Sequence, residues 1–437
     1  MLLKDNPLTK HDKRLFEVLK HFNHSLSLIH HTEERLQLAQ YNLWAGQKAK
    51  AASAYDVANK YLSAGIKFLK PINWEENYNL GFQMYKEITV CKYLMGNTKA
   101  ANNCFLILLK HTQNLLDEIE VHSIKMEMLS ALGKHPEAVK VGLSTLRNIG
   151  VKIPKKNLTA HILLTVFKIK WQLKGRRVET LSLPLMTDLK QIAIANLLTH
   201  LLDSAFFVDT RLTMLLVCKH ISLSLRYGYT ESTAVSIPAY ASFLMCMLNW
   251  YDEALSFVTF NAHLQKKYGK SSFSGRGEFM LGYAIEPYQK PIHLCNNTVL
   301  KAFQLCCEEG DIAYANYCNF ILVYHSLLLG KSLGEVKKNI HLTVSFMARA
   351  KVTDFTYLAT FYDYLTQCLE HPDFIKTEHQ ELALFEQNII KGKIEAELVI
   401  FYNNLTTLHF LLGNIKEAVK AGQNHARNDE YDKNFIL

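Results

Sequence analysis

The sequence contains few of the residues that interrupt regular structure. Its 437 residues include 19 glycines and 9 prolines, which is little punctuation for the frequent tight turns of an all-β protein. No strand-like alternation of apolar and polar residues persists along the chain. Hydrophobic residues make up 49% of the sequence, enough for a buried core, so the composition argues against disorder. These features favour an all-α protein.

The nine cysteines do not follow the pattern of a disulfide framework or a metal site. Their number is odd, no C-x-x-C pair occurs, and only Cys306 and Cys307 are adjacent. We therefore expect buried, reduced thiols and no bound metal or other cofactor. The histidines between His21 and His31 have no Cys, Asp or Glu partners in a recognisable ligand set, and we interpret them as surface or partly packed side chains.

The chain also lacks long apolar runs. The most apolar stretches, Ile162 to Phe167 and Phe320 to Leu329, are far shorter than the ~20 residues that span a bilayer. The N-terminal residues lack the basic and apolar regions of a signal peptide. We expect a cytoplasmic protein without a transmembrane segment. Export by a non-classical secretion system stays open, because the polar C-terminus from Asn428 to Leu437 could carry a signal.

One short unit recurs along the chain. Between Phe410 and Gly422 an apolar run ends at Gly413, and a second helical pattern starts at once with Ala418 five residues after the glycine. Glycine permits the left-handed backbone that ends a helix, and alanine allows the second helix to pack closely on the first. The same spacing occurs at Gly46 and Ala51, Gly96 and Ala101, Gly133 and Ala138, Asn249 and Ala254, and Gly310 and Ala315.

Helix-turn-helix units of this kind bury their apolar faces by stacking on one another. Gly96 and Gly133 lie about one tetratricopeptide (TPR) period apart, which is roughly 34 residues. We therefore predict an all-α, TPR-like α-solenoid, a right-handed superhelix of stacked helix pairs. Residues 1–150 and 191–437 would hold helix pairs, and residues 151–190 an irregular connector with a basic helix, all in one continuous solenoid. Predicted helices start at positions that include Trp74, Asp354 and Thr377.

Several stretches resemble a known family. They are Leu15 to Asn23, Glu34 to Ala39, Gly46 to Tyr55, Ala64 to Ile66, Leu181 to Asp188, Ser222 to Gly228 and Gly310 to Ala315. Together they look like the TPR-like helical-repeat region of large bacterial multi-sensor signalling proteins, which carry a kinase-like domain, an AAA/STAND-type ATPase, GAF domains and a histidine kinase. The resemblance covers the chain to about residue 350 and implies a helical fold. The catalytic modules are absent from these 437 residues, so no catalytic residue can be carried over.

A cluster of positive charge marks the best candidate for a contact surface. Five basic side chains are interleaved with Phe167 and Trp171 within one predicted helix and the turn after it: Lys168, Lys170, Lys174, Arg176 and Arg177. With a net charge of +9, the chain favours a partner with acidic groups. The alternative interpretation is a solvated helix face whose aromatic side chains point into the core. No nucleic-acid-binding signature accompanies the cluster, so we expect a protein or peptide partner.

The sequence shows no motif for catalysis. Gly269-Lys-Ser and Gly330-Lys-Ser resemble the end of a phosphate-binding loop, but both lie in helical sequence and lack the earlier glycine that such a loop needs. No G-x-S-x-G elbow or H-E-x-x-H pair occurs. Acidic pairs at helix termini are common without any catalytic role. An enzyme would need ionisable groups that converge from different helices into a deep pocket.

The most economical function is a non-enzymatic scaffold for protein–protein interactions in bacterial signalling or regulation. Two alternatives share the same fold. The chain could be a connector fragment of a multidomain signalling ATPase or histidine kinase, or an exported effector that acts on a foreign target. The sequence does not fix the oligomeric state, the repeats that form the binding groove, or whether these residues are a full gene product.

Overall fold

The computed structural model describes residues 8–10, 12–52, 54–70, 76–269, 271–350, 356–374, 379–392 and 395–428. These residues are mostly helical, and the β structure among them is one isolated bridge between Leu185 and Tyr229. The predicted all-α class is confirmed. The predicted helix starts at Trp74, Asp354 and Thr377, and the C-terminal segment after Asn428, lie outside the described residues.

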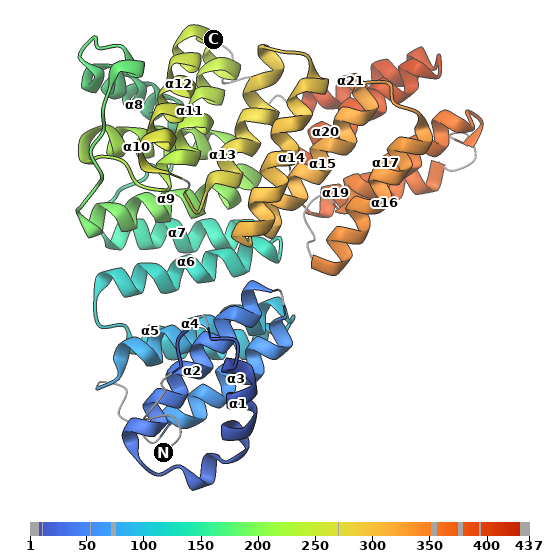
Figure 1. Ribbon diagram of the computed structural model, residues 1–437. Coiled ribbons are helices and arrows are strands. Elements are labelled where there is room, and N and C mark those ends of the chain that lie inside the picture. Colours follow the sequence, from blue (N-terminus) through green and yellow to red (C-terminus); the bar gives the residue numbers. More distant parts are fainter. Residues whose placement is uncertain are drawn as a thin grey trace. The chain divides into compact units, whose positions relative to one another are not determined.

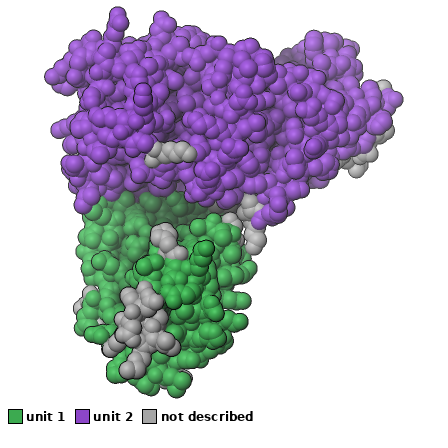
Figure 2. Space-filling view, viewed as in Figure 1, with its two compact units in different colours: residues 1–128 green, residues 129–437 purple. Residues whose placement is uncertain are grey.

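The chain divides into two compact units, residues 1–128 and 129–437 (Figure 2). The division falls near the end of helix α6. In the first unit α2 packs on α1, α3 and α4, and α4 packs on α5. The helices up to the division are α1 (Leu15–His24), the short 3-10 turn η1 (Leu26–Leu28), α2 (Thr32–Ala51), α3 (Tyr55–Leu69), α4 (Tyr78–Leu94), α5 (Thr98–His111) and α6 (Leu115–Ala131).

The second unit continues the succession of helices (Figure 1). Many helices adjacent in sequence pack on each other, as α9 does on α10 and α14 on α15. Around α8 and α12 the packing skips one helix, so that α7 packs on α9, α8 on α10 and α11 on α13. The helices are α7 (His135–Asn148), α8 (Leu158–Leu173), η2 (Val178–Thr180), α9 (Leu189–Val208), α10 (Thr210–Tyr227), α11 (Thr233–Leu248), α12 (Tyr251–Tyr268), α13 (Ser274–Met280), the π-helical η3 (Leu281–Ile285), η4 (Glu286–Tyr288), α14 (Ile292–Glu309), α15 (Ile312–Leu328), α16 (Leu333–Ala350), α17 (Thr356–Glu370), α19 (His379–Gly392), α20 (Glu395–Leu411) and α21 (Ile415–Asn428).

The predicted turns share one hydrogen-bonding scheme. At the α20–α21 turn, Gly413 has a φ of 74°, and the N–H of Asn414 donates to the C=O of His409 at 2.9 Å. This is the Schellman arrangement, which satisfies a carbonyl at the end of the helix. The N–H of Ala418 then makes the first α-helical bond of α21, to the C=O of Asn414. The same bonds occur at the turns of Gly96, Gly133 and Gly310.

The position of the alanine follows from this geometry. It is the first residue whose N–H bonds within the second helix, so its Cβ lies where the two helices of a pair approach each other. The alanines after these four turns are buried, and so is Ala254, which follows the left-handed Asn249. Asparagine tolerates the left-handed region better than other non-glycine residues. The spacing therefore marks real helix-ending turns at five of the six predicted places.

The sixth predicted turn, at Gly46, is wrong. Gly46 lies inside α2, and a Cβ there would come within 2.5 Å of the Leu62 side chain on α3. Ala51, which would be the packing alanine, is exposed. Gly46 thus permits close packing of α2 against α3 and does not turn the chain.

Two further sequence features behave as the pattern indicates. Asp188 caps α9 by accepting hydrogen bonds from the N–H groups of Lys190 and Gln191. The extended link before it, Leu181 to Asp188, lies against the α10–α11 turn, where Tyr229 donates to the C=O of Pro184 at 2.7 Å. A Cβ at Gly228 would come within 2.5 Å of the same carbonyl oxygen. Two of the stretches that carry the family resemblance therefore contact each other here.

One described helix, α9, is long and apolar enough to cross a membrane, contrary to the expectation that every apolar run is too short. It has 20 residues, and half of its most apolar window is buried inside the structure. It packs on α7 and α10, and its Asp203 pairs with Arg276. These are the contacts of a core helix in a folded unit.

We expect leucine at the buried alanine of a turn to destabilise the first unit. In Ala101→Leu the larger side chain must fit among Val90, Tyr93, Ile124 and Met128, and overpacking of this kind costs about 1–3 kcal/mol. Ala51→Leu is the matched control, because Ala51 has the same spacing from a glycine but is exposed, so its change should be within about 0.5 kcal/mol. Chemical denaturation of both variants measures the difference. Equal costs would contradict the packing role of the alanine.

Candidate interaction surface on helix α8

Helix α8 holds the predicted basic segment and has one clearly buried face. Residues with left-handed backbone bound it, Asn157 (φ 54°) before it and Lys174 (φ 52°) after it. Its buried side chains recur at spacings of three and four residues, as on one face of a helix, and α8 packs on α10. They are Ile162, Val166, Ile169 and Leu173.

The opposite face of α8 is also apolar, and it is exposed. Leu164, Phe167 and Trp171 follow one another at helical spacing, and 64%, 69% and 74% of their surfaces are accessible. The interpretation in which the two aromatic side chains point into the core is therefore wrong. A contiguous exposed apolar stripe on a folded protein is typical of an interaction site. We call these three residues the α8 stripe.

The five predicted basic residues fall into two groups. All five are exposed, and four of them, Lys168, Lys174, Arg176 and Arg177, lie around the α8 stripe and the turn that follows it. Lys170 instead reaches α11–α12: its Nζ lies 3.2 Å from a carboxylate oxygen of Glu253 and 3.6 Å from the ring centre of Trp250. Lys170 therefore has an acidic partner within the unit, although 41% of its side chain stays exposed.

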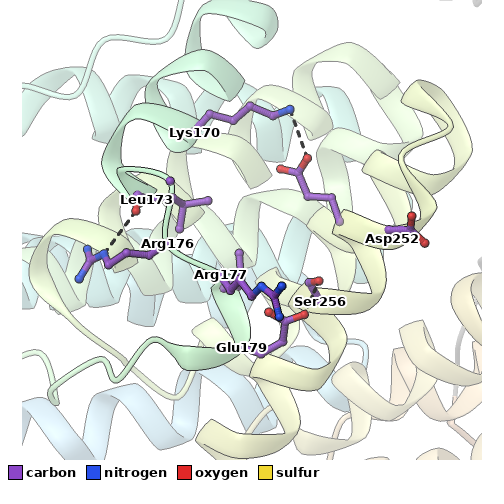
Figure 3. Close-up of a pocket in the computed structure, with 10 residues that line it drawn as sticks. Lys170, Leu173, Arg176, Arg177, Glu179, Asp252 and Ser256 are labelled. Carbon is purple, nitrogen blue, oxygen red and sulfur yellow. Dashed lines mark hydrogen bonds and ion pairs between the residues drawn. The ribbon is translucent and has the colours of Figure 1, made fainter.

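A pocket of about 470 Å³ lies beside the C-terminal turn of α8 (Figure 3). Lys170, Arg176 and Arg177 line it together with the acidic Glu179, Asp252 and Glu253. Arg176 turns back and donates to the C=O of Leu173 at 3.3 Å. A hydrogen bond from Ser256 and the nearby charge of Arg177 lower the pKa of Glu179. Because acidic and basic side chains line the pocket together, it is a poor site for a free anion. The basic segment is better suited to contact with the extended surface of a protein partner.

Sequence reasoning missed a buried Ser–His cluster between α10 and the start of α11. His220 Nε2 lies 3.2 Å from Ser232 Oγ, and Nδ1 lies 3.4 Å from Ser224 Oγ. Such a pair could suggest a nucleophile and its base, but His220 and Ser232 have no exposed surface. Burial lowers the pKa of His220 to about 4, so the imidazole is neutral. The density of Ser and Thr between Ser222 and Ser236 was the sequence signal for this cluster.

An ionic cluster at the centre of the second unit joins distant segments. Arg276 of α13 donates to Asp203 of α9 at 2.8 Å and to Asp311, which precedes α15, at 2.5 Å. Tyr314 donates to the other oxygen of Asp203 at 2.9 Å. The two carboxylates hold the pKa of Arg276 well above its usual value despite its burial. Because every charge is paired and less than a fifth of each charged side chain is exposed, the cluster is structural.

The cysteines are free, and most of them are buried. All nine cysteines are free; seven are buried as expected, but Cys246 and Cys307 are exposed, which corrects that expectation. Within the described ranges no group of three or more His, Cys, Asp or Glu side chains is placed to hold a metal ion.

Comparison with known proteins relates this chain to part of a signalling protein. No protein-family model matches the chain. It is similar to hybrid signal transduction histidine kinase G of Dictyostelium discoideum, with 22% identity over 355 residues that cover 74% of this chain and 10% of that protein. The chain resembles part of a signalling protein. It spans about a tenth of the length of this relative, and the bacterial setting remains a prediction.

The neutral, buried His220 predicts a loss of stability in acid. Its pKa is about 4 in the fold against 6.5 for the free group, so the unfolded chain binds a proton first as the pH falls. The stabilisation is complete above about pH 6.5 and decreases towards about pH 4. Between about pH 7 and about pH 5 the loss from this group is roughly 2 kcal/mol.

Hydrogen exchange of the α10 amides at the two pH values, corrected for intrinsic rates, measures this loss. His220→Gln is the comparison, because glutamine does not titrate and the acid-dependent loss in α10 should shrink by the stated amount. Burial also lowers the pKa of His325, and the comparison between the wild type and the variant removes that contribution. The same acid dependence in both proteins would contradict the assignment.

Proposed function

We propose that this chain is a non-enzymatic, TPR-like helical-repeat region of a signalling protein that binds an acidic, amphipathic helix of a protein partner on α8. The observation that carries the proposal is the exposed α8 stripe with basic side chains around it. The apolar face of a partner helix would cover Leu164, Phe167 and Trp171, in the manner of helix-in-groove recognition. Acidic groups beside that face would meet Lys168, Lys174, Arg176 and Arg177 and fix the orientation.

The repeat character is supported by the turns. A single helix pair of this kind leaves an apolar face uncovered, and stacking of further pairs covers it. The recurrence of one turn geometry at Gly96, Gly133, Gly310 and Gly413 is the feature that favours a TPR-like solenoid. Such arrays present continuous surfaces for protein partners, and the exposed stripe on α8 would be one of them.

Another exposed apolar group lies at the α20–α21 turn, and it is the weaker candidate. Phe410, Leu411, Ile415 and Val419 are exposed there. They are divided between two helices, and their polar neighbours include both Lys416 and Glu417. The α8 stripe runs along one helix and has charge of one sign nearby, so it offers a better defined complement to a partner.

A second candidate function is that of a connector within a larger signalling protein. The similarity to a region covering about a tenth of a hybrid histidine kinase favours it. In that arrangement the partner helix would belong to the same polypeptide or the same assembly. The connector and the scaffold use the α8 stripe in the same way and differ in the origin of the helix that covers it.

Affinity capture with two variants tests the proposed surface. Phe167→Ser with Trp171→Ser removes the aromatic anchors, and Lys168→Glu with Arg177→Glu reverses part of the charge. Exposed aromatic anchors at interfaces are worth about 2 kcal/mol or more each, so the first variant should weaken partner binding at least tenfold. The second should also weaken binding, with an effect that shrinks as the salt concentration rises.

The control is Leu342→Ser, which removes another exposed apolar side chain, on α16. All variants should keep the wild-type unfolding temperature, because every altered side chain is exposed. Proteins that bind the wild type and the control but not the two α8 variants should contain an acidic amphipathic helix. Recovery of the same proteins by all four forms would reject the α8 stripe as the binding surface.

A further inference from the structure

A second, larger pocket lies in the second unit, away from the basic segment. Its volume is about 650 Å³, within the range of roughly 300–1,000 Å³ that is usual for small-molecule sites. Eight elements supply its walls: α9, α10, α11, α13, the π-helix η3, the short turn η4, α14 and α15. Apolar side chains dominate the lining, among them Phe206, Met214, Val217, Phe243, Met247, Met280, Ile292 and Leu328.

The lining selects against charged ligands. Among the described residues that line it, none is Asp, Glu, Lys or Arg. The histidine in it, His325, is almost fully buried, and burial lowers its pKa so that it is neutral near pH 7. A charged ligand would lose its hydration here without gaining an opposite charge, which is costly. An uncharged ligand does not meet this penalty.

His325 also offers a hydrogen-bond acceptor. Its Nδ1 lies 2.7 Å from Oδ1 of Asn296, an arrangement in which Nδ1 carries the proton and donates. In the neutral ring Nε2 is then an acceptor, and within the described residues it has no hydrogen-bond partner. A ligand with a hydroxyl or an N–H group would satisfy it. The pocket thus has one polar acceptor in a mainly apolar wall.

The π-helix gives this pocket its shape. π-Helices are rare in proteins, and those that occur are often found at functional sites. Here η3 places the neighbouring residues Tyr283 and Ala284 on the same pocket wall. Gly282 permits this because a Cβ there would lie 2.9 Å from Cγ2 of Val299 on α14. The Tyr283 ring stacks on Phe279 and remains partly exposed towards solvent.

From these features we infer that the pocket binds an uncharged, mainly apolar small molecule with an aromatic ring and one hydroxyl or N–H donor. Tyr283, Tyr288, Phe206 and Phe243 would contact the ring, and His325 Nε2 would accept the hydrogen bond. This site goes beyond the proposed protein-binding function, because its lining includes no residue of α8. Either role can fail without affecting the other.

Three related probes test the chemistry directly: naphthol, naphthalene and naphthoate. Naphthol has the ring and the donor, naphthalene lacks the donor, and naphthoate is charged at neutral pH. Saturation-transfer NMR on the full chain should rank naphthol first, at least tenfold tighter than naphthalene, with no detectable binding of naphthoate. His325→Leu should abolish the preference of naphthol over naphthalene while naphthalene binding remains.

Two exposed cysteines report where the probe binds. Cys246 lines the pocket, and its Sγ lies 3.5 Å from the hydroxyl oxygen of Tyr288. Cys307 is also exposed, but it does not line the pocket. Naphthol should slow the alkylation of Cys246 several-fold and leave Cys307 unchanged. Ala284→Phe, which fills the pocket from η3, should remove both the NMR signal and the protection. Ala262→Phe, at an exposed position on α12, should retain both.

The inference is overturned if naphthoate binds as well as naphthol, or if binding persists unchanged in Ala284→Phe. It is also overturned if no probe binds and alkylation of Cys246 instead blocks capture of a protein partner, which would make the pocket part of a protein interface. Wild-type unfolding temperatures in Ala284→Phe and His325→Leu establish that a loss of binding is not a loss of fold.

Discussion

The structure depends on a single local constraint, the close approach of two helices at a left-handed turn. Gly413 follows the end of one helix, its neighbour Asn414 satisfies a carbonyl at that end, and the buried Ala418 begins the hydrogen bonding of the next helix. Because the backbone geometry sets both positions, the turn fixes the angle at which the second helix leaves. The same turn recurs at Gly96, Gly133 and Gly310 and joins a pair of helices at each place.

Helix α8 departs from this plan. Helices within a stack of pairs meet neighbours on more than one side, but α8 packs mainly on α10 and carries apolar side chains on the opposite face as well. Exposure of Phe167 and Trp171 to water is unfavourable for the isolated chain, and the fold does not cover them. A partner that covers them recovers this free energy on binding. The nearby basic side chains restrict which partners can do so.

The sequence predicted the helices well because their signals are local. Thr210 and Tyr227 bound α10 as predicted, and Asp188 caps α9, since capping and apolar periodicity are properties of neighbouring residues. The turn predicted at Gly46 was wrong because glycine occurs both at helix-ending turns and where two helices pack closely. The close approach of the Leu62 side chain shows that Gly46 has the second role, and the sequence does not reveal that contact. The sequence also indicates the basic segment. It does not reveal features that depend on contacts between distant residues, which are the exposure of Trp171, the pairing of Lys170 with Glu253 and the pocket beside η3.

The central claim is that the α8 stripe contacts a partner protein. Its most direct test is photocrosslinking in cells that express the chain, with a photoreactive amino acid at position 167 and, as a control, at the exposed position 342 on α16. The account predicts a discrete crosslinked product from position 167, attached within an acidic amphipathic helix, and none from position 342. No product from position 167, or equal products from both positions, would contradict it.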